Sequence, residues 1–106
     1  MAETHAIDRL FAVIDARKGT SPETSYTAKL FADGVLKIAK KLGEEGVETA
    51  LAAVAQDKAA LTAESADLLY HLLVLWSACG LEPADVYAVL DARAGRSGLD
   101  EKASRT

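Results

Sequence analysis

Two long helical patterns joined by a short turn occupy residues 35–79, which read VLKIAKKLGEEGVETALAAVAQDKAALTAESADLLYHLLVLWSAC. In the first pattern, apolar side chains recur at the spacing of an amphipathic helix up to about Ala55. Asp57 can accept hydrogen bonds from the free amides of a first helical turn, so a second long helix is expected over residues 58–79. The short turn makes these two helices antiparallel.

Helical patterns also flank this central pair on both sides. Upstream, the pattern of the first long helix extends back to Tyr26, with a break or kink expected at Gly34. Another amphipathic helix is expected over residues 4–18, where apolar residues again recur at helical spacing. Downstream, Pro83 suits the first position of a helix that continues to about Arg93.

The composition agrees with a single small helical domain. Half of the 106 residues are hydrophobic and only two are proline, which is typical of helical proteins. We therefore predict an all-α fold with a four-helix subunit over residues 1–94. A flexible C-terminal tail is expected over residues 95–106, which are polar and contain glycine.

The helix expected over residues 58–79 carries two apolar stripes. One passes through Leu61, Leu68, Leu72 and Leu75, and the other passes through Leu69, Leu73 and Trp76. A four-helix subunit can bury one stripe internally and the other against a second copy, which favours a helical homodimer. The alternative is a monomer whose first and last helices cover both stripes.

Charge and apolar content exclude several classes of function. Sixteen acids against 12 bases give a formal net charge of -4, whereas a protein that binds a nucleic-acid polymer needs a basic surface. The most apolar stretch, residues 68–79, is too short to span a bilayer, so no membrane is expected as a partner. The lone Cys79 can form no internal disulfide and the first residues lack a signal-peptide pattern, which together favour a cytoplasmic location.

Acidic residues are paired three positions apart on both of the long helices. Glu45 and Glu48 lie on the first helix, and Glu64 and Asp67 lie on the second. Residues at this spacing are neighbours on a helix surface, and the antiparallel arrangement brings the two pairs face to face. Four carboxylates near apolar surface repel one another unless they take up protons, stay open to water or hold cations.

Two interpretations of these acids are open. Oxygen-only donors select hard ions, so a metal site here favours Mg²⁺, with Mn²⁺ as a substitute. Alternatively, each acid is a solvated charge on an exposed helix face, which is the ordinary position of glutamate. Both pairs border the apolar stripes of their helices, and this position weakens the second interpretation for the set as a whole.

The spacing Glu-x-x-Glu followed by Glu-x-x-Asp resembles the signature of the all-α, MazG-like nucleoside triphosphate pyrophosphohydrolases. Longer strings around the acids resemble the phosphoribosyl-ATP pyrophosphohydrolase family in particular, and the resemblance extends over residues 7–93. These strings are SYTAKL at 25–30, KLGEE at 41–45 and ADLLYHLLVL at 66–75. One departure is Gly46-Val47 between the glutamates, where Ala and a small polar residue would be expected, but it removes no ligand.

The resemblance implies a MazG-like fold and a dimeric, magnesium-dependent enzyme. Its reaction would be hydrolysis of phosphoribosyl-ATP to phosphoribosyl-AMP and pyrophosphate, the second step of histidine biosynthesis, with bound magnesium activating water. The implied metal ligands are Glu45, Glu48, Glu64 and Asp67. Glu44 joins Glu45 and Glu48 as a candidate catalytic acid, either as the ligand of a second metal or as the general base, and its alternative is a solvated surface charge.

Basic and hydroxyl-bearing residues near the acids are candidates for binding the phosphates of the substrate. They are Arg17, Lys18, Ser25, Tyr26, Thr27, Lys29, Lys37, Lys40 and Lys41. Ordinary surface charge or loop capping is the alternative for each, although lysine placed before glutamate is the less favourable order for an ion pair within a helix. His71 stands in an apolar run and is interpreted as a hydrogen-bonded core or interface residue rather than a catalytic one.

Two other functions fit part of this pattern. A house-cleaning nucleoside triphosphate pyrophosphohydrolase would use the same acids, and only the strings around Ser25 and His71 argue against it. A non-catalytic helical dimerisation module would carry the acids as solubilising charge and would bind no magnesium.

Overall fold

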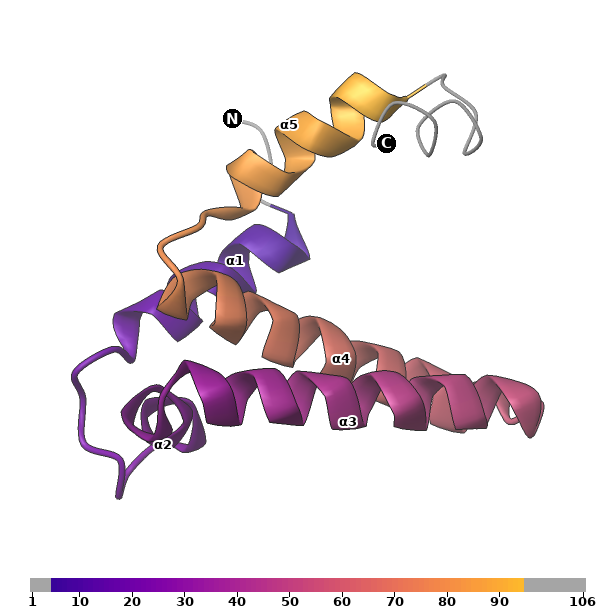
Figure 1. Cartoon of the computed structure of the whole chain (residues 1–106), viewed down its shortest axis with the longest axis horizontal. Helices are drawn as coiled ribbons and strands as arrows, with labels where there is room; N and C mark the ends of the chain where they lie inside the picture. Colours follow the sequence, from indigo (N-terminus) through magenta and orange to yellow (C-terminus); the bar gives the residue numbers. More distant parts are fainter. Residues whose placement is uncertain (1–4, 95–106) are drawn as a thin grey trace.

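The structure, a computed structural model, describes residues 5–94, which form α-helices and contain no β-strand (Figure 1). The helices are α1 (Ala6–Ala16), α2 (Tyr26–Asp33), α3 (Val35–Val54), α4 (Lys58–Ala78) and α5 (Pro83–Arg93). The all-α prediction is therefore confirmed. The predicted tail over residues 95–106 lies outside the described residues.

The predicted four helices become five in the described part of the chain, because the interruption at Gly34 is a complete break. Gly34 has φ 93° and ψ 171°, a conformation that is essentially restricted to glycine. Its amide donates to the carbonyl oxygens of Leu30 and Phe31, which ends α2. The next residue begins α3, and the two helices run in different directions (Figure 1).

α3 and α4 form the antiparallel pair that the sequence predicts, and they lie side by side along most of their length (Figure 1). Asp57 caps α4 as predicted, because its Oδ1 accepts from the amide of Ala60 at 3.0 Å. Gln56 in the turn has φ 58°, a left-handed conformation that helps the chain to reverse. The turn end of this pair extends beyond the other helices (Figure 1).

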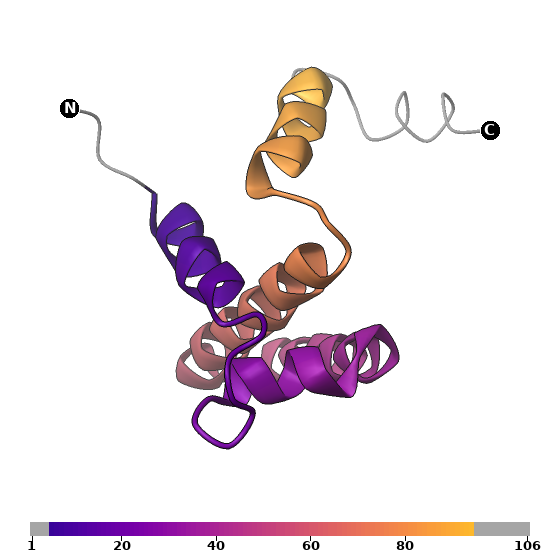
Figure 2. The same ribbon diagram turned by 90° about the vertical axis from the view of Figure 1, so that its left-hand side faces the viewer.

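The core lies where α1 packs against α4 and α2 packs against α3 and α4. Figure 2 shows how these helices are arranged. Its buried side chains are Ile14, Leu30, Ile38, Leu73 and Val74. α5 lies outside this core and contacts α1, where the Tyr87 hydroxyl donates to Asp8 Oδ1 at 3.1 Å.

None of the helices in residues 5–94 is by itself long and apolar enough to cross a membrane. Only α4 and α5 taken together match the length and composition of a span, and they are bent by 112° at the break between them.

Two glycines are expected to respond in opposite ways to replacement by alanine. A Cβ at Gly46, within α3, would lie 4.0 Å from Leu68 Cδ1, an ordinary contact. Gly46→Ala is therefore expected to raise the free energy of unfolding by about 0.5–1 kcal/mol, because glycine is unfavourable inside helices.

Gly34→Ala is expected to lower the free energy of unfolding by about 1–2 kcal/mol, because alanine is strained at the positive φ that Gly34 adopts. Thermal unfolding measures both changes, and a lower Tm for Gly46→Ala would contradict the first.

Candidate metal centre

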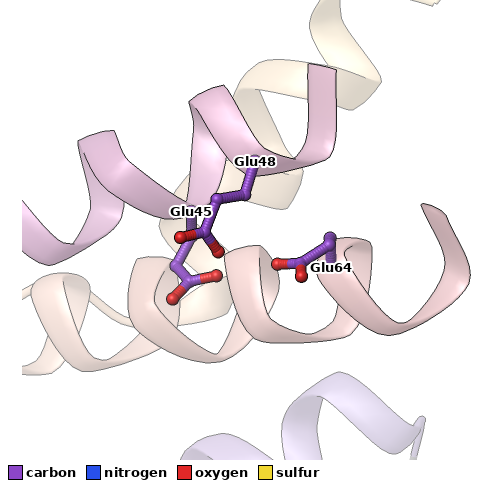
Figure 3. A group of neighbouring side chains, drawn as sticks. All are labelled: Glu45, Glu48 and Glu64. Carbon is purple, nitrogen blue, oxygen red and sulfur yellow. The ribbon is translucent and has the colours of Figure 1, made fainter. Parts of the chain in front are cut away.

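Three of the four paired acids converge between the two long helices (Figure 3). Glu45 and Glu48 project from α3, and Glu64 projects from α4. One carboxylate oxygen from each of the three lies within 4.8 Å of the others. The convergence follows from the spacing, because residues three apart share a helix face and the antiparallel turn places α4 opposite that face.

Asp67 does not join this cluster, although the sequence predicts it as a fourth ligand. It lies three residues beyond Glu64 on α4, the same spacing that separates Glu45 from Glu48, so the spacing alone does not decide which acids converge. The Asp67 side chain is exposed, whereas Glu64 is half-buried. Glu44 is also exposed on α3 and lies outside the cluster. The roles predicted for Asp67 and Glu44 stay predictions.

The cluster is electrostatically costly without a cation. Glu45 Oε2 and Glu64 Oε2 are both buried and have no hydrogen-bond partner, and an unsatisfied buried polar atom is unfavourable. Desolvation raises the pKa of Glu64 from 4.5 to about 7, and the carboxyl groups of Glu48 and Glu45 act in the same direction. The site therefore favours either a proton or a positive ion.

The donor set suits a hard divalent cation. All three side chains offer carboxylate oxygens, which such ions prefer, and the two unpartnered buried oxygens are available as ligands. Glu48 is exposed, so one side of the cluster is open to solvent. An ion held here would keep positions open for water or for phosphate oxygens.

The Lys18 side chain bonds to residues of α1 and α4 rather than to the acid cluster. Its Nζ donates to the carbonyl oxygen of Ser77 at 2.5 Å and pairs with Asp15 Oδ1 at 3.4 Å. The Ser77 hydroxyl donates to the same Asp15 oxygen at 2.6 Å. This hydrogen bond is the largest cause that lowers the pKa of Asp15. Lys18 thus links the end of α1 to the end of α4.

The hydroxyl-bearing residues at the start of α2 bond to the fold as well. Ser25 caps the helix, because its Oγ accepts from the amide of Ala28 at 3.2 Å. The hydroxyl groups of Thr27 and Tyr70 share a hydrogen bond between α2 and α4. The Tyr26 ring stacks on the ring of Tyr70 at 6.3 Å between centroids. The structure therefore supports the capping interpretation of Ser25 and places Tyr26 and Thr27 against α4.

His71 is a buried, hydrogen-bonded residue, in agreement with the interpretation from sequence. Its Nδ1 lies 2.8 Å from the carbonyl oxygen of Asp67, and a carbonyl only accepts, so Nδ1 carries the proton. In the neutral ring Nε2 then accepts from the Tyr26 hydroxyl at 3.4 Å. Sequence reasoning did not identify this cluster of Tyr26, Tyr70 and His71, because no spacing within one helix indicates that side chains of α2 and α4 meet.

The remaining basic candidates are solvent-accessible. Arg17, Lys29, Lys37 and Lys40 are exposed and Lys41 is half-buried. Lys29 Nζ lies 3.9 Å from Asp33 Oδ2, one turn along α2. Within residues 5–94, no ion pair joins these lysines to the clustered glutamates. Their predicted binding to phosphate stays a prediction.

The fold and the cluster together define an all-α protein with a cluster of three acids, suited to a cation, between two antiparallel helices. The sequence model of the phosphoribosyl-ATP pyrophosphohydrolase family matches residues 7–94, and this chain belongs to that family. It is accordingly a hydrolase, and the resemblance drawn from the sequence is confirmed.

Similar proteins named phosphoribosyl-ATP pyrophosphatase occur in several bacteria. The one from Azospirillum brasilense is 62% identical over 99 residues, which cover 93% of this chain and 89% of the relative. The one from Paramagnetospirillum magneticum is 58% identical, with 97% and 94% covered. The one from Caulobacter vibrioides is 59% identical, with 96% and 94% covered.

Proposed function

We propose that this chain hydrolyses phosphoribosyl-ATP to phosphoribosyl-AMP and pyrophosphate, in histidine biosynthesis and in the cytoplasm, with a magnesium ion held by Glu45, Glu48 and Glu64. Membership of the family supports the reaction. The observation that carries the metal assignment is the convergence of three carboxylates, two of which have a buried oxygen without a partner. Mn²⁺ is the proposed substitute because it accepts the same oxygen ligands.

Each acid has a distinct task in this proposal. Bound magnesium would neutralise charge on the triphosphate, orient it and lower the pKa of a bound water. Glu45 and Glu64 would hold the ion through their buried oxygens, and Glu48, which is exposed, would complete the protein ligands. Asp67 is a further ligand only if its exposed side chain turns toward the cluster, and Glu44 is the candidate general base or ligand of a second ion.

Residues outside the acid cluster select the substrate in this proposal. Phosphoribosyl-ATP differs from ATP by an added ribose phosphate, a dianion that needs its own donors. Arg17 and Lys29 are exposed, and the ion pair of Lys29 with Asp33 is long at 3.9 Å. They are therefore better candidates than Lys18, whose Nζ is bonded to both Ser77 and Asp15. A charged hydrogen bond to phosphate contributes about 1.5–3 kcal/mol to binding.

Lys29→Ala is expected to lower kcat/KM for phosphoribosyl-ATP by about 10–150-fold, the equivalent of that binding energy. Any hydrolysis of ATP should change far less, because the acid cluster stays intact. Lys58→Ala is the matched control, since Lys58 is an exposed lysine at the start of α4 with no assigned role. The measurement is turnover of phosphoribosyl-ATP and of a panel of nucleoside triphosphates, with and without magnesium.

Two results of this experiment would favour the house-cleaning alternative. One is a parallel fall of both activities in Lys29→Ala and in Arg17→Ala. The other is a preference of the unaltered protein for ATP over phosphoribosyl-ATP. A protein that binds no magnesium and hydrolyses neither substrate would instead be a dimerisation module.

A homodimer is the proposed assembly, and we place its interface on α3. Of the two apolar stripes predicted on α4, the one through Leu69, Leu73 and Trp76 contributes to the core of the subunit. Leu73 of that stripe is buried in the core and Trp76 packs against it. On α3, by contrast, four large apolar side chains are between 61% and 87% exposed, and these are Leu36, Val47, Leu51 and Val54. Light scattering is expected to give twice the mass of 11.2 kDa, and Leu51→Glu should shift the protein toward the monomer. A monomeric wild-type protein would exclude this assembly.

A further inference from the structure

The hydroxyl of Thr49 connects the two helices that carry the acid cluster. Thr49 is half-buried on α3, and its Oγ1 lies 2.7 Å from the carbonyl oxygen of Glu45, one turn earlier in the same helix. The same Oγ1 lies 3.2 Å from the carbonyl oxygen of Glu64 on α4. A hydroxyl has a single proton, so it is shared between the two acceptors.

A second threonine shows what is unusual about this contact. Threonine inside a helix commonly bonds back to the carbonyl four residues earlier, and Thr62 does so with Lys58 at 2.8 Å on the exposed side of α4. Thr49 makes the same local bond and adds an acceptor on the neighbouring helix. The two acceptors belong to the two residues whose buried carboxylate oxygens have no partner.

We propose that Thr49 is a positioning residue for the metal centre, because its hydroxyl fixes the backbone of Glu45 against the backbone of Glu64. This inference rests on the proposed function, in which both glutamates ligate magnesium. Without a bridging group, the like charges of the two carboxylates push α3 and α4 apart at this point. The Thr49 hydroxyl opposes that separation and keeps the two ligands at a distance that one ion can bridge.

The expected effect is on metal affinity more than on the fold. Removing a group that orients a metal ligand typically lowers the affinity for the metal by about 10–100-fold. Thr49→Val removes the hydroxyl and keeps the branched shape, so it is expected to raise the dissociation constant for Mg²⁺ by about 10-fold or more. Thr49→Ser keeps the hydroxyl and is expected to stay within about threefold of wild type, which is well below the loss that a removed orienting group causes.

The experiment titrates the cation-free protein with MgCl₂ by calorimetry and follows thermal unfolding of each variant by circular dichroism. Thr62→Val is the matched control, because it removes the same local hydroxyl bond without touching α3. We expect Thr62→Val to bind Mg²⁺ as tightly as wild type. Should Thr49→Val fail to fold, Thr49→Ala replaces it, because alanine is the residue most favourable to a helix.

The outcomes separate this inference from the function on which it rests. Wild-type Mg²⁺ affinity in a folded Thr49→Val or Thr49→Ala variant would overturn the positioning role and leave the metal centre standing. Equal losses of affinity in Thr49→Val and Thr62→Val would also overturn it, because the effect would then come from general helix stability. A wild-type protein that binds no Mg²⁺ would overturn both the proposed metal and the role of Thr49.

Discussion

Replacing Glu48 with glutamine is expected to lower magnesium-dependent turnover of phosphoribosyl-ATP by about 10²–10³-fold, the loss that follows removal of one preorganised electrostatic contact in other active sites. The amide keeps the size of the side chain but loses the negative charge. Glu48 is the exposed member of the cluster, so the change leaves the buried packing between α3 and α4 intact. Steady-state kinetics over a range of magnesium concentrations measures the effect.

The stability of the Glu48→Gln variant distinguishes a lost ligand from a damaged fold. Without magnesium the variant should melt no earlier than wild type, because removing one carboxylate relieves repulsion of Glu64. Glu23→Gln is the control, since Glu23 is an exposed acid in the loop before α2. An unchanged magnesium affinity in Glu48→Gln would refute the ligand assignment.

Asp67→Asn tests the one predicted ligand that the structure leaves outside the cluster. If Asp67 turns toward the ion when substrate binds, the variant should lose turnover as Glu48→Gln does. If its exposed side chain stays in solvent, turnover should remain within about twofold of wild type, a change of less than about 0.5 kcal/mol, as for ordinary surface substitutions.

Magnesium affinity is expected to fall about tenfold for each pH unit below about 7 and to level off above it. The pKa of Glu64 is raised to about 7 in the cation-free protein, so below that value a proton must leave before the ion can bind. Calorimetric titration at several pH values between about 5 and about 9, which span about two units on either side of that pKa, measures the slope. An affinity independent of pH over this range would contradict a raised pKa at a ligating Glu64.

The stability of the cation-free protein should also depend on Glu64, but it should change with pH in the opposite direction to the magnesium affinity. Between its ordinary value of 4.5 and about 7, Glu64 holds more protons in the native state than in the unfolded state. The free energy of unfolding therefore falls as the pH rises through this window. Glu64→Gln should remove this fall, and saturating magnesium should offset it, because the ion stabilises the native state. Thermal melts across the window test both expectations.

Much of this architecture was predictable from local patterns. Apolar spacing located the long helices because a helix that covers a core must repeat its apolar residues at the helical period. Asp57 marked the start of α4 because its side chain can accept a hydrogen bond from a free amide of the first turn. The acidic pairs and the longer strings around them were sufficient to indicate the family. These features depend on residues close together in the chain.

The helix count was harder to predict because it depended on one backbone angle. A glycine within a helical pattern is compatible with a kink or with a full break, and its lack of a Cβ permits both. Gly34 takes φ 93°, which ends α2 and gives α3 a new direction. The contacts that hold α2 in that direction include the hydroxyl pair of Thr27 and Tyr70, which lie far apart in the sequence.

The sequence by itself determined the helical class, the antiparallel pair and the presence of acids on its facing sides. Only the tertiary structure decided that Glu45, Glu48 and Glu64 converge while Asp67 stays outside, and that Thr49 reaches a carbonyl on α4. The physical reason is that convergence depends on the rotation and separation of two helices. Packing among side chains distant in the sequence sets both the rotation and the separation, and the spacing of residues within one helix does not reveal either.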